Sequence, residues 1–179
     1  PGPDFPTGGE LVGLDGVREA YATGKGSFKV RASVEIEKVS TRKMGIVIKE
    51  LPFTIGPEKV VERIAALVKA KKIQGISDII DLTDGQTGTN VVIEIKNGFE
   101  PEAVLEQLYA LTPMEDAFSI NAVALVKGKP QTLGLKELLK VFIEHRIEVV
   151  RRRSEFRKAK AEGRLTLVDG LLKAIIDID

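Results

Sequence analysis

The sequence contains no cysteine and no tryptophan, and it has a single histidine among 179 residues. Without cysteine the chain cannot form a disulfide, a thiolate metal site or a cysteine nucleophile. The one histidine, His145, falls in the middle of a predicted helix and has no second histidine or cysteine to work with. We therefore interpret it as a surface or packing residue. Aromatic residues make up 5% of the chain, which disfavours RNA recognition by stacking of bases on a sheet.

The chain also lacks a large excess of either positive or negative charge. Lysine and arginine number 27 against 26 aspartate and glutamate residues, so the net charge is +1. Such a chain has no overall attraction for a polyanion, and any DNA affinity must come from local patches. No apolar run approaches the roughly 18 residues that a membrane helix needs, and residues 1–6 lack the pattern of a signal peptide. We expect a soluble cytoplasmic protein with no membrane partner.

The first 27 residues are rich in proline and glycine and predict a connector around one short helix near Gly16–Tyr21. From Phe28 to Glu37, apolar and polar residues alternate, which predicts one strand with a single buried face. The polar turn Ser40–Lys43 then returns a second strand over residues 46–51. These two strands predict a hairpin.

The segments from residue 46 onward follow the order strand, helix, strand, strand, helix, strand. Pro57 and Pro101 mark the two helix starts, and the later strands are predicted at 76–82, 91–95 and 118–126. This order predicts an α+β fold, namely a ferredoxin-like (split β-α-β) domain with the first hairpin added to its sheet.

From Leu135 an apolar stripe at helical spacing continues without proline or glycine to Gly163, which predicts a helix of about 26 residues. A second helix, with apolar residues on one side, is predicted over 165–176. Such a pair is typical of a coiled-coil stem. The predicted domains are therefore a connector (residues 1–27), an α/β domain (28–133) and the start of a stem (134–179).

No arrangement of residues predicts catalysis within the chain. Residues 23–27 read Thr-Gly-Lys-Gly-Ser but lack the first glycine of a phosphate-binding loop and lead into a strand. The loop carboxylates Asp78, Asp81 and Asp84 lack the glycine and terminal glutamate positions of a calcium loop. We predict no catalytic residue, no metal site and no bound cofactor in these residues.

Basic residues at two places predict contacts to a polyanion. Lys25, Lys29 and Arg31 lie along the exposed face of the first strand and its entry loop, and Arg42 and Lys43 lie at the hairpin tip. Lysine and arginine in such positions can neutralise phosphates independently of sequence. Ordinary solubilising charge explains the same residues equally well.

Several motifs resemble the A subunits of bacterial DNA gyrase and topoisomerase IV, the type IIA DNA topoisomerases. The N-terminal residues resemble the segment that connects the family's DNA-cleavage domain to its tower domain. The middle of the chain resembles the tower domain, and the basic helix resembles the start of the coiled coil. The similarity runs along essentially the whole chain. The matching segments are Gly2–Gly9, Gly16–Tyr21, Thr23–Gly26, Glu50–Phe53, Gly75–Ser77, Val92–Lys96, Leu108–Tyr109, His145–Arg146, Val149–Arg153 and Lys158–Ala159.

The resemblance implies that the parent enzyme cuts both strands of a duplex through a tyrosine, passes a second duplex and reseals the break. It further implies Mg²⁺ and ATP bound by a separate B subunit, an A2B2 assembly with an A-subunit homodimer, and a nucleoid-associated location in the cytoplasm. Neither Tyr21 nor Tyr109 stands in the motif of the family's catalytic tyrosine. We therefore expect a piece of a longer polypeptide, inactive alone, that supports double-stranded DNA arms and couples them to the exit gate.

One alternative comes from another functional class. A self-contained ferredoxin-like domain that binds a metabolite or a protein, with the long helix as a dimerisation stem, fits the same order of elements. It predicts a closed pocket and ligand binding that is insensitive to salt, whereas DNA binding is strongly salt-dependent.

Overall fold

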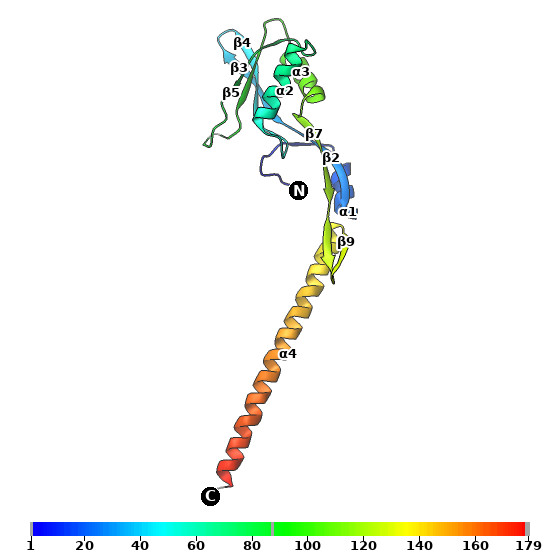
Figure 1. The fold of residues 1–179 in the computed structure, drawn as a ribbon, viewed down its shortest axis with the longest axis vertical. Coiled ribbons are helices and arrows are strands. Elements are labelled where there is room, and N and C mark those ends of the chain that lie inside the picture. The colour runs from blue at the N-terminus through cyan, green and yellow to red at the C-terminus, as the bar shows by residue number, and fades with distance from the viewer. Residues whose placement is uncertain (1, 87, 178–179) are drawn as a thin grey trace. The chain divides into compact units, whose positions relative to one another are not determined.

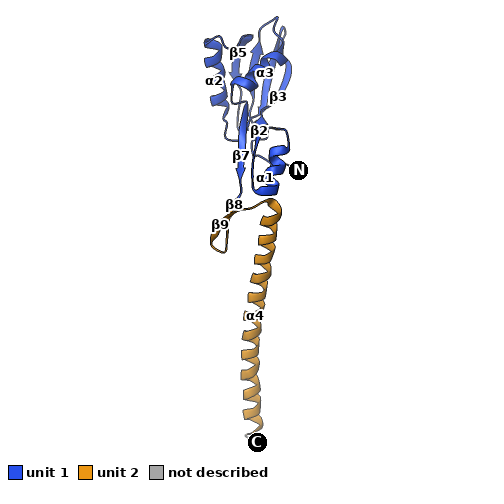
Figure 2. Cartoon of the chain, turned by 90° about the vertical axis from the view of Figure 1, so that its right-hand side faces the viewer, with its two compact units in different colours: residues 1–122 blue, residues 123–179 orange. Residues whose placement is uncertain are grey.

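The computed structural model describes residues 2–86 and 88–177. It is an α+β protein that divides into two compact units, residues 1–122 and residues 123–179 (Figure 2). The domain limits predicted after residues 27 and 133 stay predictions.

The first unit begins with a small antiparallel sheet in the order β1-β2-β7. Its strands are β1 (Glu10–Val12), β2 (Lys25–Arg31) and β7 (Glu115–Asn121). The predicted short helix is confirmed as α1 (Asp15–Thr23), and its Val17 packs against Phe28 and Val30 of β2. The rings of Phe5 and Phe118 close this small core, with centroids 4.9 Å apart.

Helix α1 and strand β2 touch through their backbones. A Cβ atom at Gly16 would lie 1.9 Å from the carbonyl oxygen of Ser27, and one at Gly26 would lie 2.2 Å from the carbonyl oxygen of Gly16. Only glycine permits this approach at both positions. The helix is thereby held directly on the strand that carries three of the predicted DNA contacts.

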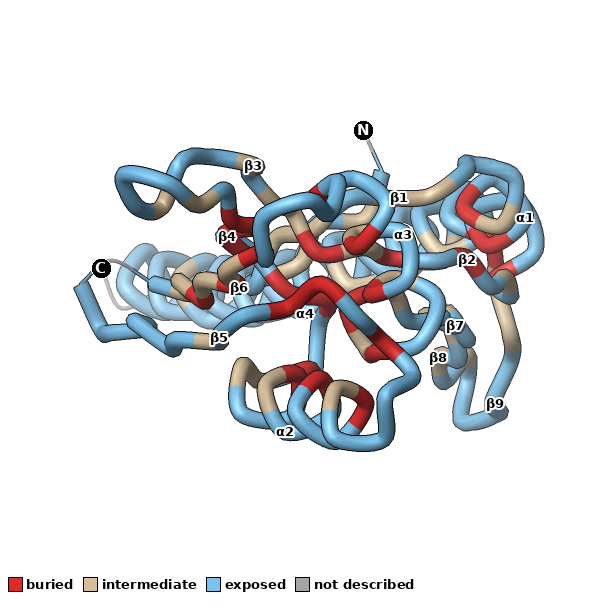
Figure 3. Tube along the Cα trace, turned by 90° about the horizontal axis from the view of Figure 1, so that it is seen from above, coloured by how far each residue is buried: buried red, intermediate tan, exposed pale blue. Residues whose placement is uncertain are grey.

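A second antiparallel sheet in the same unit has the order β3-β4-β6-β5. Its strands are β3 (Ser33–Ser40), β4 (Lys43–Glu50), β5 (Ile76–Asp81) and β6 (Val91–Ile95), and the helices are α2 (Pro57–Lys69) and α3 (Pro101–Leu111). Both helices begin at the expected prolines. Ile64 of α2 and Leu108 of α3 join Ile46 and Ile93 of the strands in one buried core. Figure 1 shows α2 and α3 beside the strands of this sheet, and Figure 3 shows buried stretches, coloured red, in α2 and in the strands.

The single strand predicted over Phe28–Glu37 is wrong, because Ala32 divides it into β2 and β3. Ala32 is fully buried, and its N–H donates to the carbonyl oxygen of Met114 over 2.7 Å. The alternation of apolar and polar residues continues through Ala32, but the strand that pairs with this segment changes there. Strand β2 pairs with β7, and β3 pairs with β4.

The ferredoxin-like classification is not confirmed. Strands β4, β6 and β5 are neighbours in the order that a split β-α-β unit requires. The last strand of such a unit would lie beside β4, but β3 occupies that position and β7 pairs with β2 in the other sheet. The predicted hairpin of β3 and β4 is confirmed, and it supplies the edge of the sheet.

The second unit consists of a hairpin and one long helix. Its elements are β8 (Val123–Val126), β9 (Lys129–Thr132) and α4 (Leu135–Ile176). The single strand predicted over 118–126 is wrong, because the structure has two strands, β7 and β8.

Two separate helices were also predicted here, and that prediction is wrong as well. Helix α4 runs for 42 residues straight through Gly163 and Gly170. A glycine inside a helix costs only about 1 kcal/mol relative to alanine. That cost is too small to end a helix that has many hydrogen bonds on either side.

Candidate nucleic-acid interface

The five predicted DNA contacts fall into two groups on different sheets. Lys25, Lys29 and Arg31 all lie on β2, in the sheet with β1 and β7. Arg42 lies in the turn between β3 and β4, and Lys43 begins β4 of the other sheet. The structure therefore brings the first three together on one strand and places the other two elsewhere.

Strand β2 has one buried face and one polar face. Phe28 and Val30 point into the small core with α1. The intervening residues Lys25, Ser27, Lys29 and Arg31 therefore share the opposite face. Their cross-strand neighbours on β7 are Asn121, Ser119, Ala117 and Glu115, respectively.

At the start of β2 this face carries amine, amide and hydroxyl groups. Lys25 is exposed and pairs in register with Asn121. The hydroxyl of Ser119 donates to that of Ser27 over 3.1 Å. These groups can donate hydrogen bonds to phosphate oxygens, and no carboxylate lies among these four residues.

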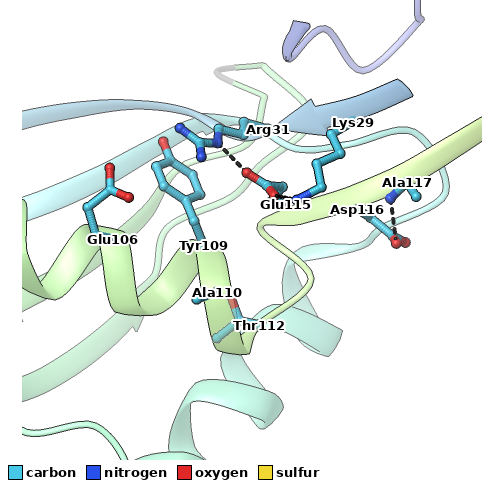
Figure 4. A pocket seen from close by; sticks show the side chains of 9 residues that line it. All are labelled: Lys29, Arg31, Glu106, Tyr109, Ala110, Thr112, Glu115, Asp116 and Ala117. Carbon is cyan, nitrogen blue, oxygen red and sulfur yellow. Dashed lines mark hydrogen bonds and ion pairs between the residues drawn. The ribbon is translucent and has the colours of Figure 1, made fainter. Parts of the chain in front are cut away.

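At the other end of β2, Glu115 binds both cations. Lys29 Nζ donates to its Oε1 over 2.7 Å, and Arg31 Nε donates to its Oε2. Figure 4 shows the carboxylate held between the two cationic side chains. The hydrogen bond from Lys29, followed by that from Arg31, lowers the pKa of Glu115. The hydrogen bond that Arg31 donates to Glu115 raises the pKa of Arg31. Glu115 and Arg31 are therefore charged near neutral pH.

Tyr109 of α3 fixes Arg31 from a second direction. The guanidinium carbon lies 4.7 Å from the centroid of the Tyr109 ring, within cation–π range. The phenol donates to the carbonyl oxygen of Ala32 over 3.1 Å. Burial raises the pKa of Tyr109, so the phenol keeps its proton.

A surface cavity of about 450 Å³ adjoins this cluster, and Glu106, Glu115 and Asp116 line it together with Lys29 and Arg31. Its charged lining differs from the mostly apolar lining of a typical metabolite pocket. The sequence interpretation missed the roles of Glu115 and Tyr109. Each lies more than 75 positions from Arg31 in the sequence. The only available signal was that they stand near the end of a predicted helix and the start of a predicted strand.

The two residues at the hairpin tip differ in their surroundings. Arg42 is exposed. Lys43 is half-buried, and its ammonium donates to Glu94 over 2.6 Å and to Ser77 over 3.0 Å. These bonds join β4 to β6 and to the start of β5, so Lys43 already has a structural role in the sheet.

Two further features bear on a metal site and on a membrane segment. Within residues 2–86 and 88–177, no cluster of three or more histidine, aspartate or glutamate side chains is arranged to hold a metal ion. None of the helices in that described part is long and apolar enough to cross a membrane.

Sequence comparisons assign the chain to a protein family. The sequence model of the DNA gyrase/topoisomerase IV A-subunit family matches residues 1–179. The chain is 46% identical over 178 residues to the DNA gyrase A subunit of Lawsonia intracellularis, covering 99% of this chain and 22% of that protein. The corresponding values for the DNA gyrase A subunit of Brachyspira hyodysenteriae are 43% over 178 residues, 99% and 21%.

A plant relative is similar to the same extent. The probable chloroplastic/mitochondrial DNA gyrase A subunit of Oryza sativa subsp. japonica is 44% identical over 181 residues, covering 100% of this chain and 19% of that protein. The chain belongs to the DNA gyrase/topoisomerase IV A-subunit family. It spans about a fifth of the length of these relatives.

Proposed function

We propose that this chain is the part of a type II DNA topoisomerase A subunit that supports the arms of the cleaved duplex and couples them to the exit gate. The parent enzyme breaks both strands of one duplex, passes another through the break and rejoins the ends. ATP and Mg²⁺ are bound by the B subunit of an A2B2 assembly that contains an A-subunit homodimer. This enzyme works in the cytoplasm at the nucleoid.

The observation that carries the arm-supporting role is the polar face of β2. Lys25 and Lys29 lie four residues apart on one strand, a separation of about 14 Å. Duplex DNA carries one charge per roughly 1.7 Å of helix axis, so the two ammonium groups can reach different phosphates. Helix α1 supports the opposite face of the strand through the close backbone contact of Gly16 with Gly26. A rigid platform of this kind helps to offset the cost of bending DNA.

Lys25→Glu tests this face with the least disturbance of the fold, because Lys25 is exposed and lies outside the ion pairs of Glu115. We expect the variant to bind a short duplex about threefold to tenfold more weakly and to lose about 0.9 from the slope of log K against log salt. Fluorescence anisotropy across a salt titration measures both quantities.

Lys59→Glu is the matched control, since Lys59 is equally exposed but lies on α2, which packs on the other sheet. Equal binding by Lys25→Glu and by the unsubstituted chain would show that the polar face of β2 is not the contact surface. A parallel assay addresses chemistry, and in it we expect the 179-residue chain alone to leave a supercoiled plasmid uncut and unrelaxed. Strand scission by the purified chain would contradict its supporting role.

A further inference from the structure

The polar face of β2 carries a carboxylate among its cations. Glu115 is mostly buried, with 11% of its side chain exposed, yet each of its two oxygens accepts a hydrogen bond from a different cation. The two cations are not equivalent. The Lys29 side chain is 61% exposed, whereas that of Arg31 is 32% exposed and lies against the Tyr109 ring.

We propose that Glu115 sets the DNA affinity of this face by competing with backbone phosphates for Lys29. The proposal rests on the proposed arm-supporting function and adds a residue that acts against it. With Glu115 in place, two cations and one carboxylate meet the DNA. A phosphate gains the full attraction of Lys29 only when that ammonium gives up its bond to Glu115.

The geometry assigns different parts to the two cations. Arg31 is held by Glu115 on one side and by Tyr109 on the other (Figure 4). Its fixed guanidinium keeps Glu115 in place, and the pKa of Glu115 is lowered first by the hydrogen bond from Lys29 and then by that from Arg31. Lys29 has a long flexible side chain and three donors, and its ammonium can exchange one acceptor for another. Lys29 is therefore the cation that moves between Glu115 and a phosphate.

This arrangement differs from an ordinary surface ion pair. On α4, Glu148 accepts from Arg152 one turn away, and both side chains are at least half exposed. Water competes for such groups on all sides, and a pair of this kind contributes little. The Glu115 side chain is only 11% exposed, so water competes less for its oxygens, and they remain strong acceptors for the ammonium of Lys29.

Glu115→Gln keeps the shape of the side chain and removes its charge. We expect this variant to bind a short duplex at least about threefold more tightly at low salt, with a salt slope steeper by about 0.9 for the one added phosphate contact. Asp116→Asn is the matched control. It removes the same charge one residue away, but Asp116 is exposed, and its Oδ1 accepts from the N–H of Ala117 rather than from Lys29 or Arg31.

Glu115→Asp separates competition from a structural role. If charge competition governs binding, the aspartate variant keeps an affinity and salt slope near those of the unsubstituted chain, and the glutamine variant departs from them. If Glu115 only maintains the shape of the strand, the isosteric glutamine behaves normally and the shorter aspartate departs. The second result would overturn the proposal.

A third comparison covers the case in which the glutamine variant folds poorly in a thermal melt. Lys29→Ala removes the moving cation, for which Glu115 already competes, so we expect it to weaken duplex binding less than Lys25→Ala does. An equal or larger loss from Lys29→Ala would contradict the assignment of Lys29. Lys25→Glu distinguishes the two proposals: if it weakens binding while Glu115→Gln does not tighten it, only the role of Glu115 fails. If neither variant changes binding, the contact face itself is wrong.

Discussion

Residues 1–122 and helix α4 bury their apolar side chains to very different extents. In the first unit Ile46, Ile64 and Ile93 have no exposed surface. Helix α4 has no buried residue in its described length, and Phe142 and Ile143 are 62% and 56% exposed. The first unit therefore has a core of its own. The helix carries an apolar stripe of the kind that needs a packing partner, since most helix stability in proteins comes from such packing.

The sharpest test of this contrast is one substitution in each region. Ile93→Ala leaves a cavity in the core beside the inner strand β6, and we expect it to lower the free energy of unfolding by about 2–5 kcal/mol. Ile143→Ala on α4 should change it by less than about 0.5 kcal/mol, because the side chain is already in water.

Tyrosine fluorescence during urea unfolding follows the first unit selectively, and far-UV circular dichroism in the same samples follows the total helix content, to which α4 contributes 42 residues. Tyr21 and Tyr109 are the only tyrosines, both lie within residues 1–122, and the chain has no tryptophan. Similar losses from the two substitutions would show that α4 is packed as well as the first unit.

Glycine substitutions provide a second contrast, with opposite signs in the two regions. Gly26→Ala forces a Cβ atom against the backbone of α1, and we expect a loss of about 1–3 kcal/mol. Gly163→Ala places its Cβ in open space within α4 and should favour the helix by up to about 1 kcal/mol.

Tyrosine fluorescence reports the first of these changes, and helix content by circular dichroism during a thermal melt reports the second. An unaffected Gly26→Ala variant would contradict the backbone contact between α1 and β2. A Gly163→Ala variant with lower helix content would contradict a continuous α4.

The elements that the sequence predicted well are those whose signals are local. Pro57 and Pro101 begin helices because a proline at the first turn loses no hydrogen bond. The pairing of β5 with β6 follows from two apolar runs around a turn-rich segment. Strand partners in the first sheet were not predictable in this way. Lys25 pairs with Asn121, almost a hundred positions away, and nothing in the local pattern selects β7 over β3 as the continuation of a sheet.

The candidate site follows the same division. Alternation placed Lys29 and Arg31 on the exposed face of the first strand, with Lys25 in the loop that enters it. In the structure Lys25 is itself part of β2, and the Arg31 side chain is 32% exposed. Glu115 was missed because it reaches Arg31 only through a register that the sequence does not encode locally. Lys43 was predicted as a DNA contact, and that stays a prediction; the hydrogen bonds from Lys43 to Glu94 and Ser77 were not foreseen. Their positions opposite the hairpin depend on the order of four strands.

The smallest expected effect concerns acid and again separates the two regions. The pKa of Glu115 is lowered in the folded state by Lys29 and Arg31. A carboxylate with a lowered folded pKa stabilises the fold above its ordinary pKa, which is 4.5 here. That contribution is lost as the pH falls through the lower folded value. We expect Glu115→Gln to cost about 1 kcal/mol or less at neutral pH, since Lys29 is largely exposed.

The difference between Glu115→Gln and the unsubstituted chain should shrink below pH 4.5 and vanish once Glu115 is protonated in both folded and unfolded states. Glu148→Gln on α4 is the control, because its pair with Arg152 is exposed and lies outside the first unit. It should leave the tyrosine signal unchanged at every pH. A constant gap for Glu115→Gln down to strong acid would mean that the side chain acts through its shape and not its charge, and the competition with phosphate proposed for it would lose its electrostatic basis.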